Sequence, residues 1–316
     1  MSSIRAVVVD PEVPGRLAIN EVEAPQAGPS EALVQVEAIS LNRGEVMGAM
    51  QAEAGWRPGW DLAGTVIKQA ANGTGPKAGS RVLGSVPTGS WAEQVAVPTN
   101  RLAELPASVT FAQAATIPTA GLTAFRALQQ GGLLLNKHVL ITGSTGGVGH
   151  FALQLARLSG AYVVGTVRHT RHEKVVHEAG ADEVIVGDDL APARAYGPYH
   201  LIIDLVGGKT LESAIPLLAT GGTCVIVGAS ASPSATIDFG ALIRTGRATL
   251  YALNMYAEFD SRPRSEDLAW LAQKVAEQQL RTPIEVEASW HEIGEVAQRL
   301  RQRQFTGKAV LHLRET

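Results

Sequence analysis

The stretch from His138 to Gly160 reads HVLITGSTGGVGHFALQLARLSG and decides the fold. It begins with an apolar run of strand character, His138 to Thr142, which is followed by a glycine-rich turn and then by apolar residues at helical spacing. A pyrophosphate can lie against bare backbone at the positive end of a helix dipole, whereas any Cβ would hold it away. The stretch therefore predicts a strand, a phosphate-binding turn and a helix, the opening unit of a dinucleotide-binding fold.

The glycines of this turn fit two registers. They read as Gly143-x-x-Gly146-x-x-Gly149 or as Gly147-x-Gly149-x-x-Ala152, and the sequence leaves both open. Both registers place the phosphate at the same turn. We therefore expect all residues of the turn to be cofactor ligands, namely Gly143, Ser144, Thr145, Gly146, Gly147, Val148 and Gly149.

The composition limits the classes of function. A chain of 316 residues favours two domains. Its formal net charge of −3 gives no broad attraction to nucleic acid or to an anionic membrane, so we expect neither as a partner. No apolar segment is long enough for a bilayer span or a signal sequence, and we expect a cytoplasmic protein. The single cysteine, Cys224, excludes an internal disulfide and a cysteine-based zinc site.

Two kinds of pattern divide the chain. Before residue 115, short strand-like segments alternate with Gly- and Pro-rich turns, and we find no helical period there. An Ala-rich helix, interrupted by Pro118 and Gly121, forms a bridge; strands and helices then alternate, which predicts a doubly wound parallel sheet with helices on both faces. We expect a β-rich substrate domain at 1–115 and 256–316 and an α/β Rossmann domain at 116–255.

Arg168 ends the second predicted strand, 19 residues beyond Gly149. An NAD site usually carries Asp or Glu near this position to bind the ribose 2′-hydroxyl, whereas an arginine suits a 2′-phosphate. The sequence thus favours NADPH, with Arg171 and Lys174 as further phosphate ligands; a solvated basic helix start is the alternative. The nearby histidines do not share one helical face, so we expect no metal site there.

Two later loops follow predicted strands of the same sheet, Asp204 to Gly208 and Gly228 to Ser230. Doubly wound sheets bind ligands at the carboxyl ends of their strands. We therefore expect these loops to flank the nicotinamide ribose and carboxamide, although glycines needed only for turning would give the same pattern. The expected ligands are Val206, Gly228, Ala229 and Ser230.

Several ordered motifs together resemble one family. They are the glycine turn, SLNRGEVM at 40–47, PGWDLAG at 58–64, AATIPTAGLTA at 114–124 and GKAVL at 307–311. Over nearly the whole chain they are similar to the zinc-independent branch of the medium-chain dehydrogenase/reductase superfamily, the quinone oxidoreductase-like and enoyl reductase-like proteins. The resemblance implies a GroES-like substrate domain beside the Rossmann domain, and a cleft in which NADPH gives hydride to a quinone or an α,β-unsaturated carbonyl compound.

The resemblance also implies roles for single residues. Asn42 matches the family position beside the nicotinamide, and Glu45 stands where relatives often carry aspartate, so both are expected in catalysis unless they only fix a loop. Thr123 and Lys308 lie in family motifs and are expected to contact the cofactor. The side chains expected to line the substrate cleft are Arg43, Trp56, Trp60 and Trp91.

Zinc-dependent relatives carry a cysteine near position 43 and a histidine at position 60 as metal ligands. This chain has Arg43 and Trp60 there, which implies chemistry without zinc. A tyrosine that some relatives carry shortly after Asn42 is replaced by Val46 or Met47. Two alternatives therefore remain: an enoyl-thioester reductase of fatty acid or polyketide type, and a non-catalytic, crystallin-like NADPH-binding protein. The family also suggests a homodimer, formed by edge pairing of the strand near 248–253.

Overall fold

The computed structural model describes residues 2–255 and 263–314. The chain forms two compact units, one comprising Met1–Leu122 with Phe259–Thr316 and the other Thr123–Glu258. The domain boundaries expected from the sequence lie after residues 115 and 255, whereas the compact units divide after residues 122 and 258. Among the described residues, no helix combines the length and the apolar character that a membrane crossing requires.

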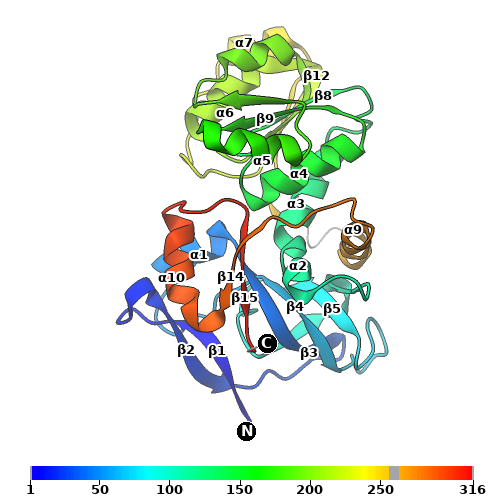
Figure 1. Cartoon of the computed structure of the whole chain (residues 1–316), viewed down its shortest axis with the longest axis vertical. Coiled ribbons are helices and arrows are strands. Elements are labelled where there is room, and N and C mark those ends of the chain that lie inside the picture. Colours follow the sequence, from blue (N-terminus) through cyan, green and yellow to red (C-terminus); the bar gives the residue numbers. More distant parts are fainter. Residues whose placement is uncertain (1, 256–262, 315–316) are drawn as a thin grey trace. The chain divides into compact units, whose positions relative to one another are not determined.

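The second unit is built on a wholly parallel six-stranded sheet (Figure 1). Its strand order is β10-β9-β8-β11-β12-β13. Counted from the first strand of the unit, this is the 3-2-1-4-5-6 order of dinucleotide-binding folds, in which ligands bind where the order reverses, here between β8 and β11. The strands are β8 (His138–Ile141), β9 (Tyr162–Val167), β10 (Glu183–Val186), β11 (Tyr199–Asp204), β12 (Leu218–Ile226) and β13 (Thr249–Ala252).

Helices cover both faces of this sheet, as predicted. Leu211 of α6 and Leu242 of α7 pack with Leu140 of β8 on one face. On the other face, Gly165 of β9 lies so close to α4 and α5 that an added Cβ would meet their side chains. The helices of this part of the chain are α3 (Leu122–Gln129), α4 (Gly147–Leu158), α5 (Glu173–Glu178), α6 (Gly208–Ala214) and α7 (Phe239–Thr245).

The first unit contains a seven-stranded sheet of order β14-β15-β3-β4-β5-β7, with β6 paired to β3, and a separate hairpin of β1 and β2. All pairs are antiparallel except β14 with β15. The strands are β1 (Ser3–Val9), β2 (Leu17–Glu23), β3 (Glu31–Leu41), β4 (Asp61–Lys68), β5 (Arg81–Ser85), β6 (Gln94–Pro98), β7 (Leu102–Glu104), β14 (Ile284–Ser289) and β15 (Lys308–His312). The predicted β-rich character of this domain is confirmed.

The expectation that no helix interrupts the strands before residue 115 is wrong. Helix α1 (Arg43–Gln51) lies between β3 and β4, whereas α2 (Phe111–Ala115) is the beginning of the predicted Ala-rich bridge. Few side chains of α1 are apolar and buried, Val46 and Ala49, so it carries no clear apolar stripe. A capping box at its start defines this helix instead. Helices α9 (Ser265–Ala276) and α10 (Ile293–Arg301) complete the unit.

The predicted interruption of the bridging helix takes the form of a π-helical turn. Ile117–Gly121 (η3) joins α2 to α3, and Pro118 lies in its first turn. Single π-turns inside helices often mark functional positions because they displace one side chain from the regular path. Here the displaced segment carries Thr119.

Trp91 belongs to the hydrophobic core of the first unit. Its side chain is 0% exposed and packs in one cluster with residues of β1, β3 and β4. Its carbonyl oxygen accepts a hydrogen bond from the N–H of Val7 at 2.8 Å, which fixes it beside the hairpin. The prediction that Trp91 lines the substrate cleft is therefore wrong, because its indole ring is fully buried in the core.

Candidate functional site

The glycine turn has no space for side chains at two of its positions. Gly143 has a positive φ of 64°, and a Cβ on Gly149 would lie 2.5 Å from the carbonyl oxygen of Gly143 and 2.8 Å from Cα of Ser144. At Gly146 the same test gives only an ordinary contact of 3.5 Å. Gly149 belongs to both registers left open by the sequence, whereas Gly143 belongs only to the first.

The start of α4 presents backbone donors without a side-chain cap. Gly146 is the N-cap, so the first N–H groups of the helix, on Gly147 and Val148, have no intrahelical acceptor. Gly146 is exposed, and Thr145, Gly147 and Val148 are partly exposed. Together with the helix dipole, these donors suit an anionic group. The turn therefore fits the pyrophosphate that the sequence predicts.

Ser144 has a different role from its neighbours. Its hydroxyl is buried, donates to the carbonyl oxygen of Ile141 at 2.8 Å and accepts from the N–H of Thr166 at 2.9 Å. These bonds tie β8 to β9 directly beneath the turn. The Ser144 side chain is thus part of the scaffold, and its backbone N–H also bonds to β9, donating to the carbonyl oxygen of Thr166 at 3.3 Å.

A second buried network joins β8 to β11 at the point where the strand order reverses. The Thr142 hydroxyl donates to Asp204 Oδ1 at 2.6 Å and accepts from the N–H of Leu205 at 3.0 Å. Asp204 Oδ2 accepts from the N–H of Gly207 at 2.7 Å. Burial raises the pKa of Asp204, while the hydrogen bonds from Thr142 and the loop backbone oppose that rise. This network shapes the loop that the sequence analysis expects at the nicotinamide.

The structure brings the predicted ligands of the later loops to the glycine turn. A Cβ on Gly143 would lie 3.2 Å from Cγ2 of Val206, so the first loop packs against the turn. Two hydrogen bonds join the second loop to the first. Ser230 Oγ donates to the carbonyl oxygen of Leu205 at 3.2 Å, and the N–H of Ala231 donates to the carbonyl oxygen of Val206 at 2.8 Å. Gly228 and Ala229 lie in this second loop; Gly228 is close enough that a Cβ would meet the Leu205 carbonyl at 2.8 Å.

The predicted phosphate-binding cations lie at the end of the neighbouring strand. Arg168 directly follows β9 and is exposed. Arg171 is also exposed and donates from Nε to His172 at 3.1 Å, whereas Lys174 lies 3.8 Å from Glu178. Because β8 and β9 are adjacent and parallel, Arg168 and the glycine turn both lie at the carboxyl ends of these strands. The ribose of a dinucleotide is bound at this end of the sheet in such folds.

In the first unit, Asn42 and Glu45 form the capping box of α1. Glu45 Oε1 accepts from the backbone N–H of Asn42 at 2.6 Å and from its Nδ2 at 3.1 Å, and Oε2 accepts from the N–H of Trp60 at 2.6 Å. All three donors are N–H groups. The carboxylate thus fixes both the start of the helix and the approach to β4.

Asp61 and Lys308 extend this box into a larger buried group. Asn42 Nδ2 donates to Asp61 Oδ2 at 2.8 Å, and Thr119 Oγ1 donates to Asp61 Oδ1 at 2.5 Å. The Lys308 ammonium donates to Asn42 Oδ1 and to the carbonyl oxygen of Leu41, and it lies 3.7 Å from Asp61 Oδ2. We call Asn42, Glu45, Asp61, Thr119 and Lys308 the acid–lysine cluster.

The charged members of the acid–lysine cluster are nearly inaccessible to solvent. Glu45, Asp61 and Lys308 are 1%, 0% and 3% exposed. Burial, followed by the charge of Asp61, raises the pKa of Glu45 above its usual value. Burial also raises the pKa of Asp61, against the opposing effect of Lys308, and it lowers the pKa of Lys308 itself. Because the Lys308 ammonium group is buried, it holds the Asn42 side chain in place and is not an exposed contact for a cofactor.

The remaining predicted residues lie around α1 and at the start of the second unit. The Trp60 ring lies against Gly44, where a Cβ would meet it at 2.6 Å. Arg43 donates to the carbonyl oxygen of Arg301 at 3.3 Å, and Trp56 is a partly buried residue packed on the core. Thr123 is 3% exposed in α3. Sequence reasoning missed the joint role of Lys308 and Thr119, because only the pairing of β15 with β3 and the π-turn bring them to Asp61.

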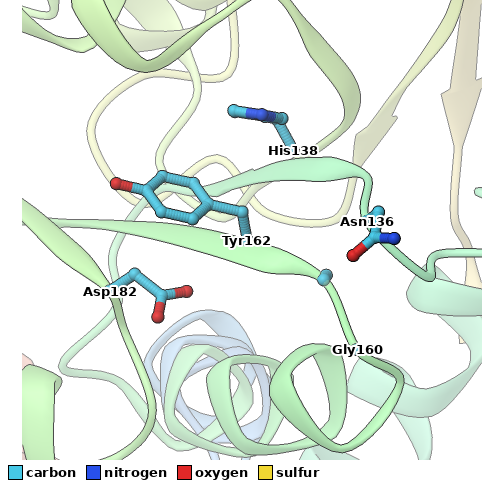
Figure 2. A pocket seen from close by; sticks show the side chains of 6 residues that line it. Asn136, His138, Gly160, Tyr162 and Asp182 are labelled. Atoms are coloured by element: carbon cyan, nitrogen blue, oxygen red, sulfur yellow. The ribbon is translucent and has the colours of Figure 1, made fainter.

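A hollow of about 360 Å³ lies at the opposite, amino end of the parallel sheet; Figure 2 shows side chains that line it. The residues that line it lie at the starts of β8, β9 and β10. The Tyr162 hydroxyl points away from Gly160 and donates to Glu183 at 3.3 Å. Because the glycine turn follows the carboxyl end of β8, this hollow is separate from the candidate cofactor site. Its lining residues are Asn136, His138, Gly160, Ala161, Tyr162 and Asp182.

Comparisons with known proteins cover both units. The alcohol dehydrogenase GroES-like domain matches residues 28–107, and the zinc-binding dehydrogenase family matches residues 147–274. A chloroplastic quinone oxidoreductase of Triphysaria versicolor is 36% identical over 200 residues, which are 58% of this chain and 60% of that protein. A mycocerosic acid synthase-like polyketide synthase of Mycobacterium tuberculosis is 32% identical over 214 residues, 64% of this chain and 10% of that protein.

The chain therefore spans less than two thirds of the length of both relatives. Among solved structures, a mycobacterial protein complexed with NADPH superposes with a TM-score of 0.86 at 26% identity, covering 98% of this chain and 99% of that one. The likeness extends over both units. Within the described residues, no group of three or more His, Cys, Asp or Glu side chains is arranged to hold a metal ion.

Proposed function

The chain belongs to the medium-chain dehydrogenase/reductase superfamily, in its quinone oxidoreductase-like branch, and from this membership we propose an NADPH-dependent reductase that acts on quinones or α,β-unsaturated carbonyl compounds without zinc. One observation carries the proposal. The uncapped start of α4, where Gly149 leaves no room for a side chain, shares a sheet edge with Arg168. Bare backbone donors for a pyrophosphate and a cation for a 2′-phosphate thus occur together.

The residues present fit such a cofactor, because the start of α4 has no side-chain cap and its first residues, Gly147 and Val148, are partly exposed. The N–H groups of Gly147 and Val148 would hold the pyrophosphate, and Arg168, helped by Arg171 and Lys174, the 2′-phosphate. The two later loops would hold the nicotinamide ribose and carboxamide, and Thr123 opens α3 on the same unit. When bound, NADPH supplies hydride to an electron-poor carbon.

The residues at the two family positions for zinc ligands support chemistry without zinc. Arg43 carries a guanidinium group, which is always protonated, and the indole nitrogen of Trp60 only donates. Neither offers the lone pair that zinc needs. The negative charge that develops on the acceptor oxygen must then be stabilised by hydrogen-bond donors of the protein. Oxidation of NADPH in the presence of a panel of quinones and enones tests this function, and bound NADPH that no acceptor oxidises would reject it.

Arg168→Ala is expected to raise the Kd for NADPH about 10- to 100-fold and to leave the Kd for NADH unchanged, because only the 2′-phosphate loses a charge-assisted hydrogen bond. Titration calorimetry with both cofactors measures this difference. Arg194→Ala, at an exposed arginine of the same unit, is the matched control and should bind both cofactors as the wild type does. Equal weakening of NADPH and NADH by Arg168→Ala would reject the assignment.

The similarity to a polyketide synthase favours a second candidate, an enoyl-thioester reductase. Adding an enoyl thioester to the acceptor panel distinguishes it, since turnover of the thioester but not of free enones would select this activity. A non-catalytic, crystallin-like role corresponds to NADPH binding without turnover of any acceptor. We also propose a cytoplasmic homodimer joined through β13, which is an edge strand of the parallel sheet.

A further inference from the structure

The acid–lysine cluster contains two buried carboxyl groups but a single buried cation. With Glu45 and Asp61 ionised, Lys308 would leave one negative charge uncompensated at sites that are at most 3% exposed. A buried unpaired charge is costly, and such groups usually take up a proton instead. The charged groups that face one another here are Glu45 from α1, Asp61 from β4 and Lys308 from β15. The cluster therefore favours one bound proton, shared by a coupled pair of carboxyls.

The hydrogen-bond partners decide which oxygen can carry that proton. Both oxygens of Glu45 accept only from N–H groups, which cannot accept in return. Asp61 Oδ2 likewise faces the Asn42 amide, whose Oδ1 is turned to Lys308. Asp61 Oδ1 alone faces a hydroxyl, that of Thr119 at 2.5 Å. A hydroxyl can donate or accept, so this is the one carboxyl oxygen of the cluster on which a proton finds an acceptor.

Thr119 connects this buried position to the outside of the cluster. It is the only partly exposed residue in the run from Ala114 to Ala124, all of whose other members are buried. The π-turn of η3 places it there. The Thr119 hydroxyl contacts the buried acid and belongs to a partly exposed residue, so it can pass a proton by receiving one and releasing another.

We propose that Asp61 Oδ1 holds a proton shared with Thr119 Oγ1, and that Thr119 passes a proton to the acceptor during reduction. This inference rests on the proposed function. The reduction uses one hydride from NADPH and one proton. Hydride forms a C–H bond at the electron-poor carbon of an enone or an O–H bond at a quinone oxygen. The electron pair displaced from the double bond takes the proton from Thr119. Asp61 returns its proton to Thr119 and regains one from water.

The ground-state half of the proposal is tested on the protein without cofactor. A protonated carboxyl gives a carbonyl-stretch band in the infrared that is distinct from carboxylate bands. We expect such a band near neutral pH, shifted by ¹³C labelling of aspartate carboxyls and unaffected by labelling of glutamate. It should disappear in Asp61→Asn, move in Thr119→Val, which loses the hydrogen bond, and return to its original position in Thr119→Ser.

Two results would overturn the proposal: the absence of a protonated-carboxyl band from the wild type, and a band that responds to glutamate labelling or survives in Asp61→Asn. The second result would place the proton on another buried carboxyl, that of Glu45, Asp204 or Asp267. Labelling needs no substitution and separates aspartate from glutamate; if Asp61→Asn does not fold, a band that fails to move in Thr119→Val excludes Asp61. Because the measurement requires no turnover, its failure is distinct from failure of the proposed function.

The transfer half is tested by activity. Thr119→Val should lower kcat about 100-fold and leave the Kd for NADPH unchanged, while Thr119→Ser restores kcat, since general acid catalysis contributes at least this factor. The wild-type rate should fall in D₂O, and Thr119→Val should change that solvent isotope effect. A Thr119→Val variant with the wild-type kcat and isotope effect would exclude Thr119 from proton transfer.

Discussion

Gly149→Ala is expected to abolish tight NADPH binding, raising the Kd at least about 100-fold, and to destabilise the second unit by about 1–3 kcal/mol. The new Cβ would lie 2.5 Å from the carbonyl oxygen of Gly143 and 2.8 Å from Cα of Ser144. Both neighbours are backbone atoms, so no flexible side chain can move aside. The turn must open, which displaces the donors that would hold the pyrophosphate. Chemical denaturation and titration with NADPH measure the two effects.

Gly146→Ala is the matched control for the fold. Its φ is −79°, and its added Cβ would make only an ordinary 3.5 Å contact with the Gly143 carbonyl oxygen. We expect its free energy of unfolding to equal that of the wild type within about 1 kcal/mol, the cost of an alanine at an N-cap. A Gly149→Ala protein as stable as Gly146→Ala, with unchanged NADPH affinity, would refute the assignment of this turn.

Lys308→Met is expected to lower the free energy of unfolding of the first unit by about 3–5 kcal/mol at neutral pH, because it leaves two buried carboxyls without their cation. Lys308 and Asp61 are 3% and 0% exposed, so solvent cannot replace the lost charge. The methionine keeps most of the volume, which limits the effect of cavity formation. Denaturant unfolding as a function of pH measures the change.

The loss should depend on pH in a definite direction. Without the cation, the pKa values of Glu45 and Asp61 rise further in the folded state, so the folded chain binds more protons than the unfolded chain. The deficit relative to the wild type is therefore smallest in acid and grows as the pH rises through the range in which the folded wild type loses a carboxyl proton that the folded variant keeps; burial places this range above the ordinary carboxyl pKa values. Lys174→Met, at an exposed lysine 3.8 Å from Glu178, should show no such trend. A pH-independent loss would mean that packing rather than charge explains the effect.

Most of the second unit, with the exception of α7, could be predicted from local patterns. The stretch around Gly143 to Gly149 contains strand, turn and helix in one run, and each signal depends on neighbours in the sequence. The six parallel strands follow from their apolar segments and the alternation with helices. Ser144 shows the limit of this reasoning, because its hydroxyl is drawn into the scaffold by Thr166, a partner that only the sheet pairing brings near.

The candidate site of the first unit depended on contacts that the sequence does not display. Asn42 and Glu45 were identified through a family motif, but Lys308 reaches them from 266 positions away in the chain, through the pairing of β15 with β3. Helix α1 lacks an apolar stripe and is defined by its capping box, so periodicity missed it. Trp91 was expected to line the substrate cleft because of its aromatic ring, yet the same apolar area places it in the core.

The most direct test of the central claim follows hydride from NADPH into an acceptor. The protein is treated with a chelator, its zinc content is measured, and it is then mixed with NADPH deuterated at C4 and a panel of quinones and enones. We predict that the zinc-free protein oxidises the cofactor, and that the reduced enone carries one deuterium by mass spectrometry. Bound NADPH that is oxidised with no acceptor of the panel, or activity that returns only when zinc is added, would contradict the account.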